Sequence, residues 1–206
     1  MELSTSNIGA VVLAAGNSSR MGFPKQLLEL DGKTLLVKTC ESILSAGIKK
    51  IVVVTGAYQN EISNCILNYP VEEFHNPNWE TGMASSINVG VTSISNQFSE
   101  LDAIIICLCD QPFLNAQHIS NLIDPYQKSE KKIVTSYYNG LESVPALFTK
   151  SYFKNLLDLS GQEGARKIIR KNKSSVYKVP FPRGIYDVDT LEAWEKVKTL
   201  YKEDRY

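Results

Sequence analysis

Residues 8–25 read IGAVVLAAGNSSRMGFPK, and this stretch joins an apolar run to a loop that contains cations and no acid. The apolar run, Ile8–Leu13, predicts a β-strand that is covered on both faces. The loop is rich in residues that restrict or free the backbone, and its notable members are Gly16, Arg20, Gly22, Pro24 and Lys25. A loop of this composition is either an ordinary surface turn or a site for a strongly negative ligand.

Beyond this stretch, short β-rich runs alternate with longer helical runs. Further strands are expected at 51–54, 71–74, 103–108, 132–136, 145–148 and 174–179. Helices are expected at 33–46, 59–67, 83–94, 117–126, 151–159, 164–171 and 190–201. Strands separated by helices of this length predict βαβ units and a mostly parallel sheet. We therefore expect an α/β fold, a three-layer α/β/α arrangement with a Rossmann-like sheet, in a single domain spanning residues 1–206.

The bulk composition excludes several classes of protein. Lys and Arg together number 22, as do Asp and Glu, so the net charge is zero and favours neither nucleic acid nor an anionic membrane as a partner. No apolar run approaches the ~18–20 residues that cross a bilayer, and residues 1–7 lack the pattern of a signal peptide. The four cysteines form no Cys-x-x-Cys pair, which disfavours a zinc site. We expect reduced thiols and a cytoplasmic location.

Ligands of open α/β sheets bind beyond the carboxyl ends of the strands, so the loop after Leu13 lies at the expected binding edge. Its glycines would allow positive φ and close approach of the backbone, and successive N–H groups would cradle phosphate oxygens. Arg20 and Lys25 would add full positive charges. The alternative is a solvated turn with two surface cations. The loop matches neither the Walker pattern nor G-x-G-x-x-G, which disfavours a dinucleotide-dependent dehydrogenase.

Two acidic segments are candidates for a metal site. Asp110 follows a strongly apolar predicted strand, where a carboxylate would lie at the same edge as the first loop. Mg²⁺ prefers hard oxygen ligands and often takes only one or two carboxylates. The alternative for Asp110 is an Asx turn at the strand end. Asp187 and Asp189 precede the last predicted helix, and Asp189 is either a ligand or the N-cap of that helix.

These segments resemble the MobA-like nucleotidyltransferases, whose signature L-A-x-G-x-S-x-R-M-G-x-P-K matches residues 13–25. Further matches are GMASSI (82–87), CDQPFL (109–114), LSGQEGARKII (159–169) and DVDTLEAW (187–194), in the family's order. Together they are most similar to the molybdenum cofactor cytidylyltransferase branch. The resemblance implies the fold of nucleotide-diphospho-sugar transferases. It also implies a nucleotide site formed by Leu13, Ala14, Ala15, Gly16, Ser18, Arg20, Lys25, Gly82, Met83, Ser85 and Ser86.

The resemblance further implies a reaction. Mg²⁺ would be held by Asp110 and Asp189, and Arg20, Lys25 and Asp110 would be catalytic. The N-terminal half would bind CTP or another NTP, and the C-terminal half would bind molybdopterin as acceptor, with pyrophosphate as the second product. A recipient molybdoenzyme would be a protein partner. Because Gln162 and Ser143 depart from the family pattern, two alternatives stay open: a nucleotidyltransferase acting on a sugar phosphate or methylerythritol phosphate, and a non-catalytic carrier of a cofactor or nucleotide.

Overall fold

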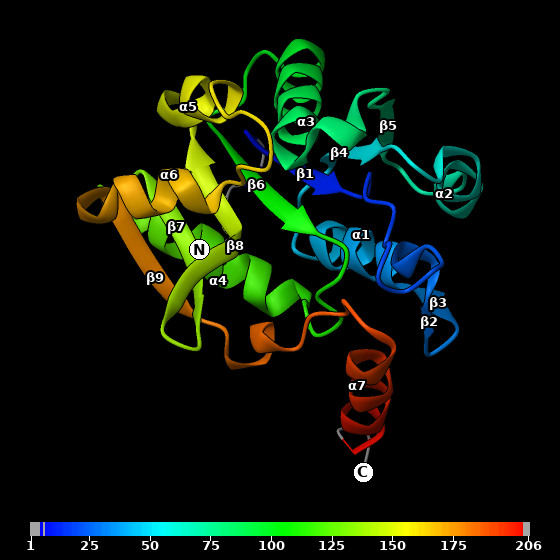
Figure 1. Cartoon of the computed structure of the whole chain (residues 1–206). Coiled ribbons are helices and arrows are strands. Elements are labelled where there is room, and N and C mark those ends of the chain that lie inside the picture. The colour runs from blue at the N-terminus through cyan, green and yellow to red at the C-terminus, as the bar shows by residue number, and fades with distance from the viewer. Residues whose placement is uncertain (1–4, 6, 204–206) are drawn as a thin grey trace.

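The computed structural model describes residue 5 and residues 7–203, and a seven-stranded sheet forms its centre (Figure 1). The N-terminal segment for which no signal peptide is expected lies mostly outside these residues. The strands are β1 (Ile8–Leu13), β4 (Lys50–Thr55), β5 (Glu72–His75), β6 (Ala103–Leu108), β7 (Ile133–Tyr138), β8 (Leu141–Thr149) and β9 (Val176–Pro180). Their order is β5-β4-β1-β6-β8-β7-β9.

The sheet is mostly parallel, as expected, with one reversed strand. β4 and β6 both pair in parallel with β1, so that Val12 lies between Val53 and Cys107. β8 runs antiparallel to both β6 and β7, and β7 pairs in parallel with β9. The apolar side chains of β1 are buried on both faces, as the sequence predicts for a central strand. The carboxyl ends of β1, β4 and β6 therefore meet at one edge.

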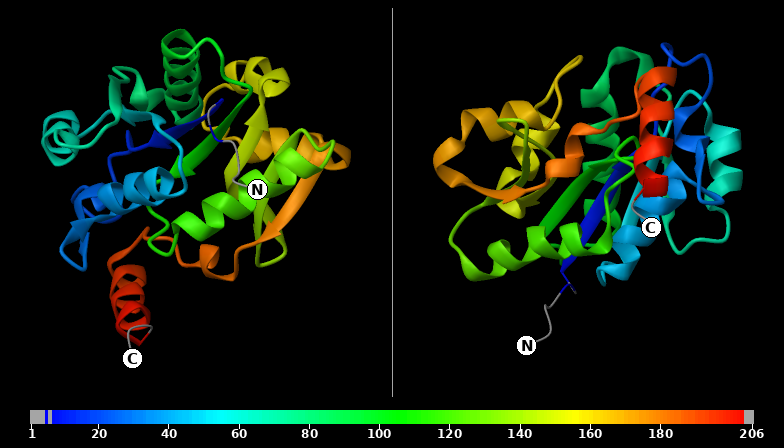
Figure 2. Two further views of the ribbon diagram at one scale, coloured as in Figure 1. Left: turned by 180° about the vertical axis from the view of Figure 1, so that it is seen from behind. Right: turned by 90° about the horizontal axis from the view of Figure 1, so that it is seen from below.

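Helices cover both faces of the sheet (Figure 2). One apolar cluster joins the sheet to α1 (Leu35–Ser45), α2 (Gln59–Ile66) and α4 (Ala116–Lys128). The opposite cluster joins it to α3 (Met83–Gln97), α5 (Phe153–Leu157) and α6 (Arg166–Lys171). This arrangement confirms the expected three layers. No helix within residues 7–203 is long and apolar enough to span a membrane.

A third, smaller cluster attaches the last helix, α7 (Leu191–Glu203), to the first loop. Trp194 and Val197 of α7 pack there with Met21 and Phe113. This contact brings residues 187–190, which precede α7, to the carboxyl edge of the sheet.

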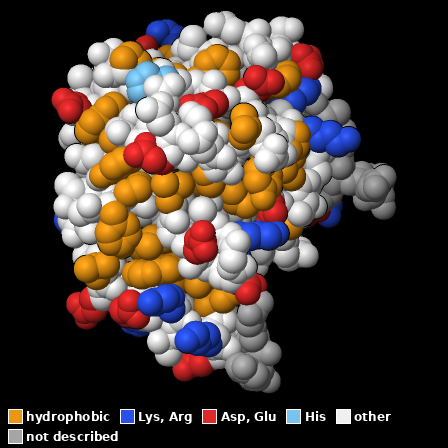
Figure 3. Space-filling view, turned by 90° about the vertical axis from the view of Figure 1, so that its right-hand side faces the viewer, with side chains coloured by type: hydrophobic (Ala, Val, Ile, Leu, Met, Phe, Trp, Pro, Cys, Tyr) orange, Lys and Arg blue, Asp and Glu red, His pale blue; other side chains and the backbone are white. Residues whose placement is uncertain are grey.

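Figure 3 views the molecule from the right-hand side of Figure 1 and shows hydrophobic side chains in a broken band between scattered acidic and basic ones.

The structure shifts several predicted boundaries. The helix expected at 33–46 begins only at Leu35, because Lys33–Thr34 forms the short strand β3, paired with β2 (Glu29–Leu30). The Thr34 hydroxyl accepts a hydrogen bond from the amide of Val37 and caps the helix. Short 3₁₀ turns occur at Lys25–Leu27, Trp79–Thr81, Lys150–Tyr152, Lys173–Ser175 and Pro182–Ile185. Most of them fill positions that hydrophobic periodicity leaves unassigned or merges with neighbouring helices, but Lys173–Ser175 overlaps the strand expected at 174–179, which begins only at Val176.

Candidate active site

The loop after β1 is fixed by a buried glutamine. The Gln26 amide nitrogen donates to the carbonyl oxygens of Ala14 at 3.0 Å and Gly16 at 2.8 Å. The Ser18 hydroxyl accepts from the Lys25 amide at 3.1 Å and donates to Gln26 Oε1 at 3.3 Å. Because these bonds tie the beginning of the loop to its end, the loop curls back over the carboxyl edge of the sheet.

The loop backbone differs in one detail from the prediction. Gly22 has a φ of +73°, as expected, but Gly16 does not adopt a positive φ, and Ser18 does, at +50°. A Cβ placed on Gly16 would meet no atom within 4 Å. The absence of a side chain at Gly16 therefore leaves open space beside the loop, and Gly22 with Ser18 makes the turn.

Two cations and two carboxylates that are distant in sequence meet at this edge. Lys25 Nζ lies 2.6 Å from Asp110 Oδ2 and 2.7 Å from Asp189 Oδ1. Arg20 Nη2 lies 2.6 Å from Asp189 Oδ2. The side chains of Lys25 and Asp110 are only 17% and 14% exposed, whereas that of Arg20 is 67% exposed. The structure thus brings together Arg20, Lys25, Asp110 and Asp189, the four charged site residues expected from the sequence.

The charges in this network perturb one another. Burial would lower the pKa of Lys25, but the carboxylates of Asp110 and Asp189 outweigh burial and raise that pKa above its ordinary value. Burial likewise would raise the pKa of Asp189, but Lys25 and Arg20 lower it. The pKa of Asp187 is raised by burial and by the nearby charges of Asp110 and Asp189. Lys25 is therefore fully protonated and Asp189 is ionised at neutral pH.

The network also fits a divalent cation bound together with a ligand. Asp110 Oδ1 is buried and has no hydrogen-bond partner, although a lone buried carboxylate oxygen is costly. The backbone amide of Val188 donates to the Asp110 carbonyl at 2.9 Å and holds Asp187 and Asp189 beside Asp110. Within residues 7–203, no three His, Cys, Asp or Glu side chains are grouped to hold a metal by themselves. A metal here would need phosphate oxygens or water to complete its coordination, as Mg²⁺ commonly does.

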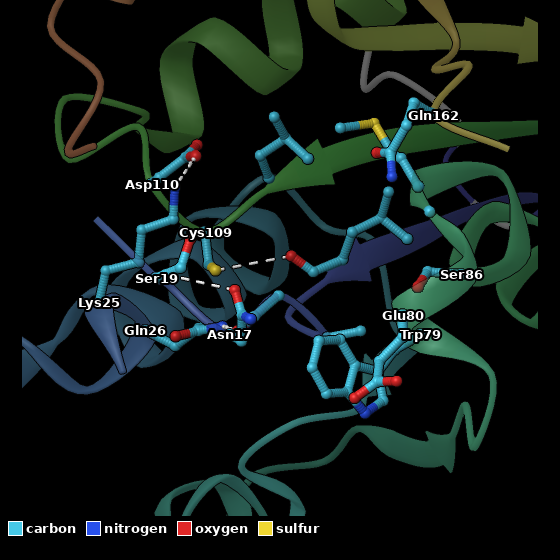
Figure 4. A pocket seen from close by; sticks show the side chains of 16 residues that line it. Asn17, Ser19, Lys25, Gln26, Trp79, Glu80, Ser86, Cys109, Asp110 and Gln162 are labelled. Atoms are coloured by element: carbon cyan, nitrogen blue, oxygen red, sulfur yellow. Dashed lines mark hydrogen bonds and ion pairs between the residues drawn. The ribbon is translucent and has the colours of Figure 1, made fainter. Parts of the chain in front are cut away.

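A cavity of about 470 Å³ opens beside this network (Figure 4). Of the residues expected at the nucleotide site, it is lined by Leu13, Ala15, Gly16, Lys25, Gly82, Met83 and Ser86, and the expected metal ligand Asp110 also lines it. Ser18, Arg20 and Asp189 line an adjoining cavity of about 180 Å³. Ala14 and Ser85 line neither cavity. Ala14 is buried in the core, and the Ser85 hydroxyl accepts from Asn76 Nδ2 at 2.8 Å and donates to the Gly82 carbonyl.

The start of α3 is less open than the sequence suggests. The Ala84 amide donates to the Gly161 carbonyl at 3.1 Å, and the Ser85 amide donates to the Gly82 carbonyl. These two amides therefore already have hydrogen-bond partners within the protein. Gly82 has a φ of +120°, and a Cβ there would lie 2.3 Å from the Gly161 oxygen. Glycine at position 82 therefore permits close contact between the start of α3 and the loop before α6.

Several lining residues are not among those expected at the nucleotide site. Trp79 and Glu80 line the large cavity from the 3₁₀ turn before α3, and Gln162 lines it from the loop before α6. Gln26 also lines it and shapes the first loop. Trp79 lies three residues before Gly82. Its position just before the GMASSI motif is the one feature of the sequence that would have indicated a place at the site.

Comparison with known proteins assigns the chain to a family. The model of the MobA-like NTP transferase domain matches residues 10–176. The chain is 26% identical to the purine catabolism protein PucB of Bacillus subtilis, over 91% of this chain and 94% of that protein. It is 24% identical to the molybdenum cofactor cytidylyltransferase of Escherichia coli, over 96% and 99% of the respective chains.

Solved structures share the fold. Rv0371c from Mycobacterium tuberculosis superposes with a TM-score of 0.81 at 24% identity, over 95% of this chain and 100% of that one. A structure of the same mycobacterial protein in complex with manganese has a TM-score of 0.76 at 22% identity, over 94% and 99% of the chains. These neighbours identify the nucleotide-diphospho-sugar transferase fold. Because the family model spans most of its length, this chain belongs to the MobA-like NTP transferase domain family, which is a family of nucleotidyltransferases.

Proposed function

We propose that this protein transfers a cytidylyl group from CTP to the terminal phosphate of molybdopterin and releases pyrophosphate. The observation that carries the proposal is the network of Lys25, Arg20, Asp110 and Asp189 at the mouth of a cavity large enough for a nucleotide. A triphosphate brings several negative charges, and the buried ammonium of Lys25 is positioned to interact with them. The relationship to a molybdenum cofactor cytidylyltransferase supports the choice of CTP and molybdopterin.

In this proposal, the 1–206 chain acts as one domain whose N-terminal half binds the nucleotide and whose C-terminal half binds the acceptor. A phosphate oxygen of the acceptor attacks the α-phosphorus of CTP, and the bond from that phosphorus to the bridging oxygen of pyrophosphate breaks. The acceptor oxygen is already ionised at neutral pH, so no protein base or nucleophile is required. Lys25 and Arg20 stabilise the charge that develops on the leaving pyrophosphate.

Mg²⁺ would be held by Asp110 and Asp189, and when bound it would neutralise phosphate charge. The unpartnered Asp110 Oδ1 and the ionised Asp189 fit this ion. Both carboxylates contact Lys25 in this structure, so the ammonium must move toward the phosphates when the metal–nucleotide complex binds. In this proposal the nucleotide contacts the loop residues that line the two cavities and, at the start of α3, Gly82, Met83 and Ser86.

The first experiment measures pyrophosphate release with Mg²⁺ and freshly prepared molybdenum-loaded molybdopterin, comparing CTP, GTP, ATP and UTP. Release with CTP alone supports the full proposal, and transfer of the labelled product to a purified molybdoenzyme would then identify a recipient. Release with another nucleotide corrects the base.

The same assay separates the alternatives. Turnover only with glucosamine 1-phosphate or methylerythritol phosphate would replace molybdopterin as the acceptor. CTP binding without pyrophosphate release from any acceptor would favour a carrier. The buried contact of Lys25 with Asp110 argues against a carrier, because a protein that only binds and delivers a cofactor gains nothing from charges placed to act on a triphosphate.

A further inference from the structure

A second cavity, of about 310 Å³, adjoins the first on the side of β8 and α6. Leu13, Met83 and Asp110 line both cavities. The second cavity therefore begins at the carboxylate that would face the reacting phosphates and extends away from the first loop. Its walls combine apolar side chains, among them Ile87, Ile106 and Val144, with polar ones that include Ser143, Gln162 and Asp187.

The described residues contain three buried side-chain atoms without a hydrogen-bond partner: Asp110 Oδ1, Gln111 Oε1 and Arg166 Nε. All three belong to residues that line this second cavity. Buried polar groups in folded proteins are nearly always paired, and each unpaired one is destabilising. Three such groups around one space make this cavity a candidate site for a ligand with complementary polar groups.

The chemistry of Gln111 is fixed by its neighbours. Its side chain is buried, with 4% exposure, and its Nε2 donates to the Val144 carbonyl at 3.1 Å and to the Tyr138 hydroxyl at 3.3 Å. A carbonyl oxygen only accepts hydrogen bonds, so the NH₂ group must face Val144 and the amide cannot flip. Gln111 Oε1 is therefore an acceptor, and its ligand must present an N–H or O–H group.

Arg166 supplies the complementary group. Arg166 belongs to a helix with several basic residues, but Arg166 is half-buried while Arg170 is exposed. The Arg166 Nε–H group is buried without an acceptor, although the guanidinium is always charged. Its ligand must present an oxygen atom, and an anionic or carbonyl oxygen would bind most strongly.

We infer that Gln111 and Arg166 determine acceptor specificity by binding the part of the acceptor that does not react, through an N–H or O–H group on Gln111 Oε1 and an oxygen on Arg166. This inference rests on the proposed function, because it assigns the second cavity to the acceptor. The apolar side chains of the walls would enclose the ring or chain between these two polar groups. A site with buried hydrogen-bonding groups rejects analogues that lack the partner group, so this pair would select among phosphorylated compounds.

The test compares Gln111→Met and Arg166→Met with the matched controls Gln117→Met and Arg170→Met, whose side chains are exposed on α4 and α6. Pyrophosphate release is measured with CTP, Mg²⁺ and three acceptors: molybdenum-loaded molybdopterin, glucosamine 1-phosphate and methylerythritol phosphate. We expect each site variant to raise the KM for the acceptor about 10- to 100-fold, the effect of losing one buried or charged hydrogen bond. The KM for CTP should stay within about twofold, and the controls should match the wild type.

The outcomes separate this inference from the proposed function. Turnover of molybdopterin with unchanged acceptor KM in both site variants overturns the inference and leaves the proposed function intact. Turnover of a sugar phosphate instead, with acceptor KM raised in both variants, supports the inference and removes molybdopterin as acceptor. If Gln111→Met unfolds because the Val144 carbonyl loses its donor, the acceptor KM of Arg166→Met tests the inference by itself: a raised KM supports it and an unchanged KM overturns it. A wild-type protein that binds CTP but none of the three acceptors overturns the inference.

Discussion

Lys25 Nζ lies 2.6 Å from Asp110 Oδ2, so the end of the first loop contacts the end of β6 across 85 residues of sequence. The ammonium also contacts Asp189, and it therefore compensates part of the negative charge of the two carboxylates that would hold a metal. In this arrangement the Lys25 ammonium lies against the carboxylate oxygens that a metal ion would bind. A metal ion held by both carboxylates would therefore compete with this ammonium for the same oxygen atoms.

Metal binding should therefore depend on the nucleotide. We expect Mn²⁺, measured by the loss of its free electron paramagnetic resonance signal, to bind at least about tenfold more tightly with CTP present. CTP should gain the same factor from Mn²⁺, because coupling between two ligands is reciprocal. Lys25→Met should strengthen Mn²⁺ binding without nucleotide, whereas Lys33→Met, which changes a lysine paired with Glu41, should not. Equal Mn²⁺ affinity with and without CTP would contradict this arrangement.

The same network predicts the ranking of catalytic defects. Lys25→Met and Asp110→Asn should each lower the rate of pyrophosphate release about 10²- to 10³-fold, as expected for lost charge partners of a transition state. Arg20→Met should lower the rate of pyrophosphate release by a smaller factor, because the Arg20 side chain is 67% exposed and water screens its charge. Lys128→Met, on the exposed surface of α4, is the control. Near-normal turnover by the Lys25 or Asp110 variant would refute the assigned roles.

Gly82 should be irreplaceable for steric reasons. Alanine there would combine an unfavourable φ of +120° with a Cβ 2.3 Å from the Gly161 oxygen, so the start of α3 must move. We expect Gly82→Ala to lower the melting temperature and raise the KM for CTP. Gly32→Ala is the matched control, because Gly32 also has a positive φ, +71°, but open space around it. Backbone strain should lower the free energy of unfolding of the control by about 1–2 kcal/mol, and its KM for CTP should be unchanged. Equal KM values in both variants would show that the clash is relieved.

His118 makes the stability of the fold depend on pH. Its ring stacks on Phe181, and Nε2 lies 2.7 Å from the Ser136 hydroxyl. Burial at this position lowers the pKa of the imidazole to about 4. In the unfolded chain the pKa is 6.5. Below that pH the unfolded state binds more protons, so His118 favours unfolding by an amount that grows to about 3 kcal/mol as the pH falls to 4.

Chemical denaturation at a series of pH values tests this expectation. The wild type should lose stability between pH 6.5 and pH 4, and His118→Gln should lose less over the same interval. The variant is expected to be less stable at neutral pH, where it lacks the ring contact with Phe181, so the comparison concerns the slope with pH. Parallel pH profiles for the two proteins would show that His118 is not the group responsible.

The sequence by itself determined the layers of the fold and the composition of the first loop. Continuous apolar runs such as Ile8–Leu13 form strands covered on both faces, and strands alternating with helices form a mostly parallel sheet. Because parallel strands end at one edge, the sequence also predicted that Lys25 and Asp110 would lie near each other. The antiparallel direction of β8 could not be predicted, because the apolar pattern of a buried strand carries no information about its direction in the sheet.

Only the tertiary structure decided which polar atoms are left unpaired. Gln111 and Arg166 lie within the sequence motifs CDQPFL and LSGQEGARKII, and neither motif by itself indicates what the two side chains contact. Their significance depends on Val144, Tyr138 and the wall between β8 and α6, which come from other parts of the chain. A hydrogen bond made or missing depends on distances of a few tenths of an ångström between distant segments, and no local pattern encodes such distances.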